Sequence, residues 1–568
     1  MARKLLLRQI KELKSMRQLS TSAFLNKNDD FIIKSPLQDI VMPNARFLDR
    51  LWVESSHFKK HVALECAETK KTYTYEQLQK NMAIFATSLR KKFGLKEDDV
   101  VAAMLPNCPE FPVVAFGTLQ AGCVLTPINP IYKEFEISHQ VSTTNPKIFV
   151  TIPECYDVVL KGLEHAKSQA KIVLIDKPNK PVPKGVIKYS EIAESGEADY
   201  ALLDKVDKQN DDIAFIPFSS GTTGLPKGVE ITYKNLKAGI EIMQNERNSF
   251  PILTQGDFQD IVPCILPFFH IYGLVITLIG HLAKGCKLVT VPRFSATMYL
   301  DILKNQKPTL LYVVPPIAIL LGKHPDVKEE HFRHVRNIIC GAAPLAATDV
   351  QAILEKCKGN LEFNQGYGTT ETSALTTSTL KGSKDLDYSA SGVPMASVTM
   401  KFVDPLTGKA VPIGETGELY VKAPTVMRGY YRNEKETKDS LTDDGYFKTG
   451  DLGYYKPESG LFITDRIKEL IKVKGMQVAP AELESILRSH PAVQEAAVVG
   501  IPHQFYGEAP KAFIIKKNGQ SASPEELQTF VADKVAAFKK IEEVVFVNDI
   551  PKTSSGKILR KELKKMYA

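Results

Sequence analysis

The sequence has eight cysteines but lacks the cysteine patterns that build metal sites or disulfide frameworks. No two of them stand as C-x-x-C, and none is spaced with histidine in a way that indicates zinc. We therefore expect buried, reduced thiols. There is no internal repeat and no low-complexity tract, which argues against a solenoid or a fibrous protein. With 568 residues, 43% hydrophobic and 24% charged, the chain has the composition of a soluble globular protein of several domains.

Beyond residue 26, the chain has little net charge. Lysine and arginine (73) exceed aspartate and glutamate (65) by eight. Residues 1–26 hold six basic residues against the single acid Glu12, so five of the eight net charges lie there and three remain for the other 542 residues. A nearly neutral body gives no reason to expect nucleic acid as a partner.

The basic N-terminal segment has the pattern of a targeting signal. Leu6, Ile10 and Leu13 share one face of a helical wheel, basic residues take the opposite face, and the hydroxyl-rich stretch 20–22 follows. Residues 1–26 thus resemble a mitochondrial transit peptide and lack the apolar core of a secretory signal. The last residues, 566–568, are not the Ser-Lys-Leu peroxisomal signal. We expect a mitochondrial matrix protein; a cytoplasmic protein with a solvated N-terminal helix, or one bound peripherally to a membrane, are the alternatives.

One apolar run is long enough to cross a bilayer. Residues 261–280 contain no acid, lysine or arginine. Pro263, Pro267, His270 and Gly273 interrupt the run, which favours a buried strand followed by a turn and a helix. We expect this segment in the core of a protein that is not an integral membrane protein.

Short apolar runs alternate with helical patterns over most of the chain. This alternation predicts an α/β fold whose large N-terminal domain contains two mainly parallel sheets. The expected strands are 100–105, 147–151, 171–175, 213–218, 287–291, 310–314 and 337–339. The expected helices are 75–91, 235–244, 298–304 and 348–357. From 388 to 421 the pattern changes to short strands with glycine and proline turns, as in a small β-subdomain.

The end of the chain has the pattern of a separate, small α+β domain. Helices are expected at 480–489 and 524–538, and strands at 496–500, 511–515 and 543–547. The charged stretch 465–469 joins this part to the rest and is the expected hinge. We therefore divide the chain into a transit peptide (1–26), an N-terminal domain (27–464) and a mobile C-terminal domain (465–568).

The strongest local signal lies between an apolar strand and a helical pattern. It is the segment Ser219, Ser220, Gly221, Thr222, Thr223, Gly224, Leu225, Pro226, Lys227 and Gly228. Glycines let backbone N–H groups converge on an anion, four hydroxyls add donors, and Lys227 adds a positive charge, so the segment suits phosphate. It is not a Walker A loop, because Pro226 stands where the second glycine of that motif belongs.

Six further segments follow in the order found in the adenylate-forming enzymes, and with the phosphate loop they carry a resemblance to that family. The family includes acyl-CoA synthetases, 4-coumarate–CoA ligases and beetle luciferases. The segments are LPFFHIY at 266–272, GAAPL at 341–345, QGYGTTE at 365–371, YFKTGD at 446–451, DRIKELIK at 465–472 and PKTSSGK at 551–557. The similarity runs from about residue 40 to about residue 565 and identifies the family, not the acid.

The resemblance implies a two-step reaction with ATP, Mg²⁺ and coenzyme A. A carboxylate first attacks the α-phosphate of ATP to give an acyl-adenylate and pyrophosphate, and the CoA thiol then displaces AMP. Lys557 would bridge the carboxylate and the AMP oxygens, and His270 would position the carboxylate. Thr370 would hydrogen-bond the α-phosphate, and Glu371 would bind Mg²⁺.

The resemblance also implies a nucleotide site, an acid pocket and a pivot. Tyr367 would pack on adenine, and Asp451, assisted by Arg466, would accept hydrogen bonds from the ribose hydroxyls. The implied nucleotide-binding residues are Ser219, Ser220, Gly221, Thr222, Thr223, Gly224, Lys227, Gly341, Ala342, Ala343, Gln365, Gly366, Tyr367, Gly368, Thr369, Asp451, Arg466, Lys472 and Gln477. The implied walls of an acyl or aryl pocket are Tyr272, Gly341, Ala342 and Gly366. Asp465 would be the pivot of the C-terminal domain.

Two positions depart from the family pattern. Tyr233 stands after the phosphate loop where histidine is common, and Thr369 stands where methionine or leucine is common. Neither change removes a catalytic group, but Thr369 weakens any transfer of substrate preference from the family.

These features predict a carboxylate–CoA ligase acting on medium- or long-chain fatty acids, the common acids for such an enzyme in mitochondria. The alternative is an aromatic acid ligase of the 4-coumarate type, which segments 270–272 and 341–344 resemble; Lys323 would then meet a ring hydroxyl, or be an exposed lysine at a helix end. A luciferase-like monooxygenase shares the template. A non-catalytic adenylate-binding protein would be expected to lack Lys227, Glu371 or Lys557, and all three are present. The sequence leaves open the oligomeric state of the protein and the length of the acyl chain of its substrate.

Overall fold

The computed structural model describes residues 31–177, 180–219, 226–359, 361–373, 375–384, 386–473, 476–503, 507–535, 537–553 and 556–566. By packing, the chain divides into two compact units. Unit 2 comprises Ile40–Ser389, Pro424–Phe447 and Ile550–Ala568, and unit 1 comprises Met1–Asp39, Ala390–Ala423 and Lys448–Asp549. The expected transit peptide lies outside the described residues. The expected division at 464/465 stays a prediction; by packing, this point lies inside unit 1.

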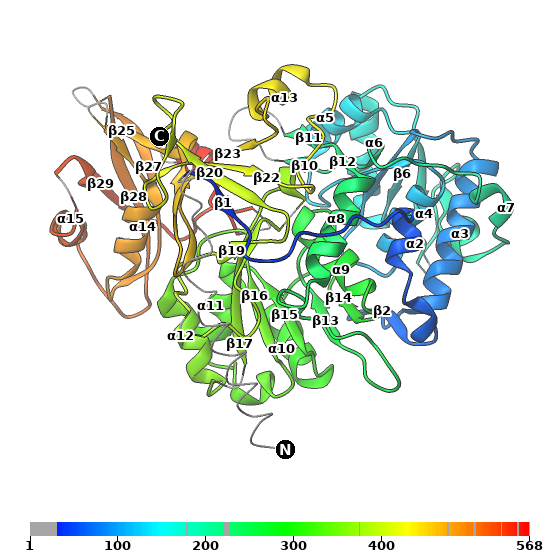
Figure 1. Cartoon of the computed structure of the whole chain (residues 1–568), viewed down its shortest axis with the longest axis horizontal. Coiled ribbons are helices and arrows are strands. Elements are labelled where there is room, and N and C mark those ends of the chain that lie inside the picture. The colour runs from blue at the N-terminus through cyan, green and yellow to red at the C-terminus, as the bar shows by residue number, and fades with distance from the viewer. Residues whose placement is uncertain are drawn as a thin grey trace, which may run out of the picture. The chain divides into compact units, whose positions relative to one another are not determined.

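The largest sheet of unit 2 has seven strands in the order β12-β9-β5-β4-β6-β7-β8, and all its pairs are parallel except β12 with β9. Its strands are β4 (Val100–Met104), β5 (Val124–Pro127), β6 (Ile148–Thr151), β7 (Lys171–Leu174), β8 (Ile187–Lys188), β9 (Ile213–Phe215) and β12 (Ile231–Thr232). The helices of this part of the chain, several of them shown in blue and cyan around β6 in Figure 1, are α2 (Phe47–Leu51), α3 (Tyr75–Lys91), α4 (Glu110–Gln120), α5 (Glu134–Thr144), α6 (Tyr156–His165), α7 (Tyr200–Leu203) and α8 (Tyr233–Gln244).

Local sequence explains why α3 begins and ends where predicted. The Thr74 hydroxyl accepts a hydrogen bond from the Gln77 N–H at 3.2 Å, and the Gln77 side chain accepts from the Thr74 N–H at 2.9 Å. This reciprocal cap satisfies two of the N–H groups that a helix leaves unpaired at its start. The buried face includes Leu78, Met82 and Phe85, which pack into the main core of unit 2.

Two further sheets of unit 2 carry most of the predicted site. One has the order β13-β14-β2-β3, with strands β2 (Val62–Cys66), β3 (Thr72–Thr74), β13 (Ile261–Cys264) and β14 (Lys287–Thr290). The other contains the parallel strands β15 (Leu310–Val313), β16 (Asn337–Cys340) and β17 (Glu362–Tyr367), followed by the antiparallel β18 (Thr377–Ser378). The accompanying helices are α9 (Gly280–Leu282), α10 (Ala296–Asn305), α11 (Pro315–Lys323), α12 (Ala347–Lys356), α13 (Glu434–Ser440) and α16 (Arg560–Met566).

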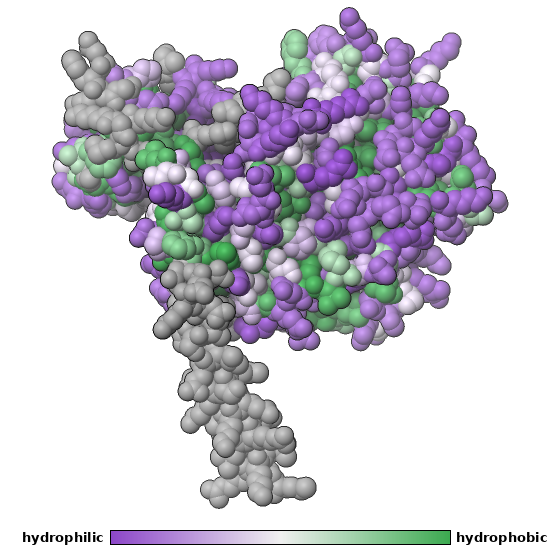
Figure 2. Space-filling model, turned by 45° about the horizontal axis from the view of Figure 1, so that its top comes forward, coloured by the Kyte–Doolittle hydropathy of each residue, from purple (hydrophilic) through white to green (hydrophobic). Residues whose placement is uncertain are grey.

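The long apolar run forms a buried strand and a helix, as predicted. Strand β13 ends at Cys264, and a wide π-type helix follows at Tyr272–Ile279 and continues into α9. All residues from 273 to 283 are buried. Of the helices in the described ranges, none is long and apolar enough to span a bilayer. On the face shown in Figure 2, hydrophilic residues cover much of the described surface, and hydrophobic residues lie in smaller groups.

Unit 1 contains the predicted β-subdomain and the small α+β part. The first sheet has the order β1-β20-β22-β23-β24, with β21 beside β20; the strands are β1 (Ile33–Lys34), β20 (Thr399–Val403), β21 (Ala410–Val411), β22 (Gly417–Lys422), β23 (Phe447–Lys456) and β24 (Gly460–Arg466). The second sheet has the order β26-β25-β28-β27, with β29 beside β28. Its strands are β25 (Ile471–Val473), β26 (Met476–Val478), β27 (Val493–His503), β28 (Gly507–Lys516) and β29 (Glu543–Phe546), with helices α14 (Pro480–Arg488) and α15 (Pro524–Ala532).

The α/β class is confirmed, and parallel pairs run through three sheets of unit 2 where two were expected. Four predicted elements were wrong in extent. The strands expected at 496–500 and 511–515 extend over Val493–His503 and Gly507–Lys516. The strand expected at 213–218 divides into β9 and β10 (Phe218–Ser219), because Pro217 between them has no N–H for a ladder. The helix expected at 524–538 ends at Ala532, because the chain must turn back beside it; the Gln528 amide donates to the Ile541 and Glu542 carbonyls at 3.3 and 2.8 Å. All eight cysteines lie in the described ranges, all are buried, and none of them forms a disulfide there.

Candidate active site

The two strands that flank the predicted phosphate loop pair as a β-hairpin in unit 2. Strands β10 and β11 (Lys227–Gly228) pair antiparallel, with Ser219 opposite Lys227. Residues 220–225 lie outside the described residues, so their phosphate contacts stay predictions. The Ser219 hydroxyl is buried and has no hydrogen-bond partner among the described residues. Because a buried polar atom without a partner is costly, this hydroxyl suits a ligand that supplies one.

A segment that the sequence did not single out joins this hairpin to the turn that carries Glu371. Residues 425–431, here called the bracket segment, follow unit 1's β22 in the chain and return to unit 2. The Tyr431 N–H donates to the Gly228 carbonyl at 2.8 Å, beside the hairpin. The Met427 N–H donates to the Glu371 carbonyl at 2.7 Å. The bracket segment therefore fixes the distance between the phosphate loop and the predicted metal ligand.

Three side chains form a row across the bracket segment. The Lys227 ammonium lies 5.2 Å from the centre of the Tyr430 ring and forms an ion pair with Glu436. The Tyr430 hydroxyl donates to Glu371 Oε1 at 3.0 Å. Burial, and next the charge of Glu371, raises the pKa of Tyr430 far above its usual range, so this hydroxyl stays a donor. The row places a cation and a carboxylate on either side of one aromatic ring.

The segment after β17 forms a tight turn around Glu371. Thr370–Thr372 is a single 3₁₀ turn, and the Thr369 N–H donates to Thr372 Oγ1 at 3.0 Å at its start. The backbone of Thr369 therefore begins this turn, and the place of its side chain beside adenine stays a prediction. Gln365 is buried and its amide donates to the Tyr388 carbonyl, so its side chain supports the strand from which the turn departs.

The predicted pocket walls come together at the carboxyl ends of β16 and β17. A methyl group built on Gly341 would lie 3.3 Å from the Gly366 carbonyl and 3.4 Å from the Tyr272 ring. The Tyr272 hydroxyl donates to the Ile339 carbonyl at 3.3 Å, which holds the ring against this edge. Ala342 has a φ of +74°, a conformation that costs an alanine about 1–3 kcal/mol and that is enriched at functional sites.

His270 lies in the turn between β13 and the wide helix, and it is neutral near pH 7. Burial, and next the positive charge of Lys557, lowers the pKa of His270 to about 4. Its Nδ1 accepts a hydrogen bond from the Tyr272 N–H at 3.3 Å, which assigns the proton of the neutral ring to Nε2. His270 can therefore donate one hydrogen bond from Nε2 to a bound carboxylate.

The loop that carries Lys557 packs with unit 2, and the positive charge of Lys557 acts on His270. The Thr553 N–H donates to the Lys557 carbonyl at 2.8 Å, and the Lys557 N–H donates to Thr553 Oγ1 at 3.1 Å, which closes the loop. Gly556 has a φ of +81°, and a methyl group there would lie 2.9 Å from Pro316 at the start of α11. A side chain at position 556 would push the loop away from α11. Residues 554–555 lie outside the described residues.

Unit 1 holds the predicted ribose group and the predicted pivot. Asp451 is buried in β23 and accepts a hydrogen bond from Arg466 Nε at 3.0 Å across the β23–β24 pair. Asp465 is also buried, and its carboxylate accepts from the Arg466 N–H at 2.7 Å and from the Ala481 N–H of α14 at 3.0 Å. The side chains of Lys472 and Gln477 lie outside the described part of the structure, so their nucleotide contacts stay predictions.

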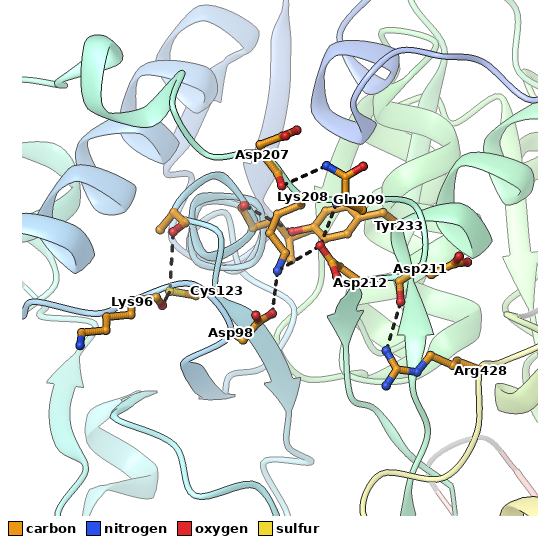
Figure 3. A network of polar contacts seen from close by, with 12 residues as sticks. Lys96, Asp98, Cys123, Asp207, Lys208, Gln209, Asp211, Asp212, Tyr233 and Arg428 are labelled. Carbon is orange, nitrogen blue, oxygen red and sulfur yellow. Dashed lines mark hydrogen bonds and ion pairs between the residues drawn. The ribbon is translucent and has the colours of Figure 1, made fainter.

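Two other residues noted in the sequence are engaged away from the predicted site. Lys323 is exposed at the end of α11 and forms an ion pair with Asp349 of α12 at 2.6 Å, which is the arrangement of a helix-end lysine. Tyr233 is buried at the start of α8, and its hydroxyl lies 3.5 Å from the Leu119 carbonyl (Figure 3). It lines a small cleft of about 80 Å³, partly open to solvent, beside Lys208. None of the predicted catalytic residues lines that cleft.

The described residues of unit 2 fit a nucleotide triphosphate with Mg²⁺. The Ser219 hydroxyl needs a partner, Lys227 supplies a positive charge, and Glu371 offers a carboxylate. Mg²⁺ in phosphate-binding sites is typically held by one or two carboxylates and by the substrate phosphates. Glu371 is the residue that would hold it here.

Comparison with known proteins agrees with this fit. Residues 51–431 match the family model described as AMP-binding enzyme, and residues 482–557 match the model described as AMP-binding enzyme C-terminal domain. The chain belongs to the AMP-binding, or adenylate-forming, enzyme family.

Curated relatives match over nearly the whole chain. 4-Coumarate–CoA ligase 1 of Arabidopsis thaliana is 34% identical over 547 residues, which cover 96% of this chain and 96% of the relative. 4-Coumarate–CoA ligase 2 of Nicotiana tabacum is 35% identical and covers 95% of this chain and 98% of its own length. The crystal structure of ATP-bound MatB from Rhodopseudomonas palustris is 28% identical, with a TM-score of 0.81, over 92% of this chain and 99% of that one.

Proposed function

We propose that this enzyme joins an apolar carboxylic acid to coenzyme A, using ATP and passing through an acyl-adenylate. The row of Lys227, Tyr430 and Glu371 carries the proposal, because it sets a cation and a metal-binding carboxylate beside a loop suited to phosphate. Family membership and the names of the relatives support it.

In the first step the acid carboxylate forms a bond to the α-phosphorus of ATP, and the bond to the pyrophosphate oxygen breaks. Both reactants are anions, so the contribution of the protein is positive charge and fixed donors. Lys227 would hold the departing pyrophosphate, and Lys557 would lie between the carboxylate and the α-phosphate. His270 Nε2–H would donate to the carboxylate and hold its second oxygen in line for attack. Mg²⁺ bound at Glu371 would neutralise charge on the phosphates.

In the second step the CoA sulfur forms a bond to the acyl carbon, AMP leaves, and the thiol proton passes to solvent or to AMP. No proton acceptor for the thiol is assigned among the residues of this chain. Asp451 and Arg466 of unit 1 would hold the ribose of AMP through this exchange, because a carboxylate can accept from both ribose hydroxyls.

A fatty acid of medium or long chain remains our first candidate for the acid. The side chains of the wall formed by Gly341, Gly366 and Tyr272 offer one polar group, the Tyr272 hydroxyl, whose hydrogen is donated to the Ile339 carbonyl. Lys323, which would have met a ring hydroxyl, is paired with Asp349 instead. A 4-coumarate-type acid is the second candidate, because the relatives at 34–35% identity carry that name.

The test is ATP–pyrophosphate exchange with a panel of acids, followed by detection of the CoA thioester by mass spectrometry. Exchange with octanoate to palmitate, and none with cinnamate or 4-coumarate, would support the first candidate. The reverse pattern would establish the second. Absence of exchange with every acid, in a folded protein supplied with Mg²⁺, would overturn the proposed function. Light emission with luciferin and ATP would identify the monooxygenase alternative.

We also propose that the enzyme works in the mitochondrial matrix, on the strength of the basic amphipathic pattern of residues 1–26. A fluorescent fusion of the full chain should enter mitochondria, and the fusion lacking residues 1–26 should not. Equal distribution of the two fusions would refute the proposal. Resistance of a membrane-bound fraction to salt and carbonate extraction would indicate a membrane anchor instead.

A further inference from the structure

Glu436, which no sequence motif indicated, contacts the phosphate-loop lysine, Lys227. Its carboxylate forms an ion pair with the Lys227 ammonium, and both side chains are largely shielded, with 35% and 16% of their surface exposed. The same ammonium lies 5.2 Å from the centre of the Tyr430 ring. The lysine thus has two favourable contacts before any phosphate arrives.

The position of Glu436 is fixed by a network of its own. Glu436 is in the first turn of α13, where the Asn433 side chain accepts from the Glu436 N–H at 3.2 Å. At the next residue, the Thr437 hydroxyl accepts from the Tyr430 N–H at 2.9 Å and donates to the Asn433 carbonyl at 2.9 Å. The hydrogen bond between Thr437 and Tyr430 therefore joins α13 to the bracket segment, and it holds Glu436 near Tyr430.

Backbone pairing brings Lys227 to this network. Val229 forms a β-bridge with Tyr430, and the Tyr431 N–H donates to the Gly228 carbonyl at 2.8 Å. Position 228 has no room for a side chain, because a methyl group there would lie 2.8 Å from Ile216. The base of the loop is thus held, while the lysine side chain can change partner by rotating about its own bonds.

The charges indicate that Lys227 can exchange its ion pair with Glu436 for contacts with the phosphates of a ligand. A triphosphate or pyrophosphate offers several negative charges and more acceptor oxygens than one carboxylate, so it should displace Glu436 from Lys227. A carboxylate left beside those phosphates repels them. We propose that Glu436 is the resting counter-ion of Lys227, gives the ammonium up to the phosphates of ATP, and takes it back as pyrophosphate leaves. This positioning role rests on the proposed function of the same site, and it speeds the release of the first product.

The experiment compares pyrophosphate binding by the full-length protein and by two variants on α13. Glu436→Gln removes the counter-ion and keeps the shape, and Glu434→Gln removes the same charge two residues earlier, at an exposed position of the same turn. Pyrophosphate affinity is measured by calorimetry, first without and then with Mg²⁺. In the ligand-free proteins, the rate at which Lys227 reacts with trinitrobenzenesulfonate is followed by mass spectrometry.

Glu436→Gln should bind pyrophosphate about 3- to 10-fold more tightly, the range expected for losing one partly shielded competing charge. Its Lys227 should react faster, its KM for ATP should fall, and its KM for the acid should stay unchanged. Glu434→Gln should match the wild type in all four measurements. Unchanged or weaker pyrophosphate binding by Glu436→Gln would overturn the inference, because a permanent support for Lys227 would give that result. If the wild type itself bound neither ATP nor pyrophosphate, the proposed function would fail instead.

Discussion

Protonation of His281 should make unit 2 lose stability in mild acid. His281 is buried in α9; its Nδ1 donates to the Ile276 carbonyl at 2.8 Å, and its ring meets the edge of Tyr312 at 4.7 Å. Its Nε2 is buried without a partner among the described residues. Burial lowers the pKa of His281 to about 4, although the charge of Asp260 and backbone carbonyls act in the opposite direction.

The sign and size of the effect follow from the two pKa values. The unfolded chain, with a histidine pKa of about 6.5, takes up a proton as the pH falls below 6.5, while folded His281 resists protonation down to about pH 4. The group therefore has no effect on stability above pH 6.5, and stability falls as the pH drops from there. Between pH 7.5 and pH 5.0 the loss amounts to about 2 kcal/mol.

The assay is guanidinium unfolding at pH 7.5 and 5.0, followed by fluorescence of Trp52, the single tryptophan, which lies in unit 2 with His281. His281→Gln can still donate to Ile276 and cannot take up a proton, so its stability should fall about 2 kcal/mol less between the two pH values. His57→Gln, at an exposed position of unit 2, should behave as the wild type. An equal pH dependence in His281→Gln and the wild type would refute the reasoning.

Three further variants test the site. Lys557→Met should lower the rate of pyrophosphate exchange about 10²–10³-fold without changing the melting temperature. A smaller loss would refute a role of Lys557 in the first step. Gly341→Ala places a methyl group 3.4 Å from the Tyr272 ring of the predicted pocket wall, so kcat/KM should fall at least tenfold more for the bulkiest accepted acid than for the smallest; an equal fall would place the pocket elsewhere. Asp451→Asn should raise the KM for ATP about tenfold with the KM for the acid unchanged, and equal changes in both would refute a ribose contact.

Local patterns predicted the helices and strands well, because the hydrophobic period of each element and the residues that begin and end it lie in its own sequence. The seven strands and four helices expected in the first 360 residues are all present, although one strand is interrupted at Pro217. The wide π-type helix at Tyr272–Ile279 could not be predicted, because its spacing depends on the packing of buried apolar residues and not on a local signal. The early end of α15 has the same cause, since residues 533–538 keep a helical pattern that tertiary contacts override.

For the site, sequence order identified the motifs but not the residues that hold them in place. Tyr430 and Glu436 are 59 and 209 positions from the groups they contact, Glu371 and Lys227. Near these two residues the sequence signals local structure only: Tyr430 and Tyr431 favour a strand, and Asn433 favours the start of a helix. Contacts of this kind arise from the fold, because the bracket segment leaves unit 1 and pairs with the strand of the phosphate loop.

The position of Lys557 has a consequence for the second step. The resemblance implied that this lysine moves with the C-terminal domain, yet residues 550–568 pack with unit 2 while Lys448–Asp549 belong to unit 1. The loop is closed on itself through Thr553, and its contact with α11 is at Gly556 and Pro316. A loop that carries its own internal hydrogen bonds can keep its shape when its contacts with unit 2 break. If Lys557 contacts the acyl-adenylate as proposed, the loop would have to move away before the thiol arrives; its close approach to Pro316 requires that position 556 has no side chain.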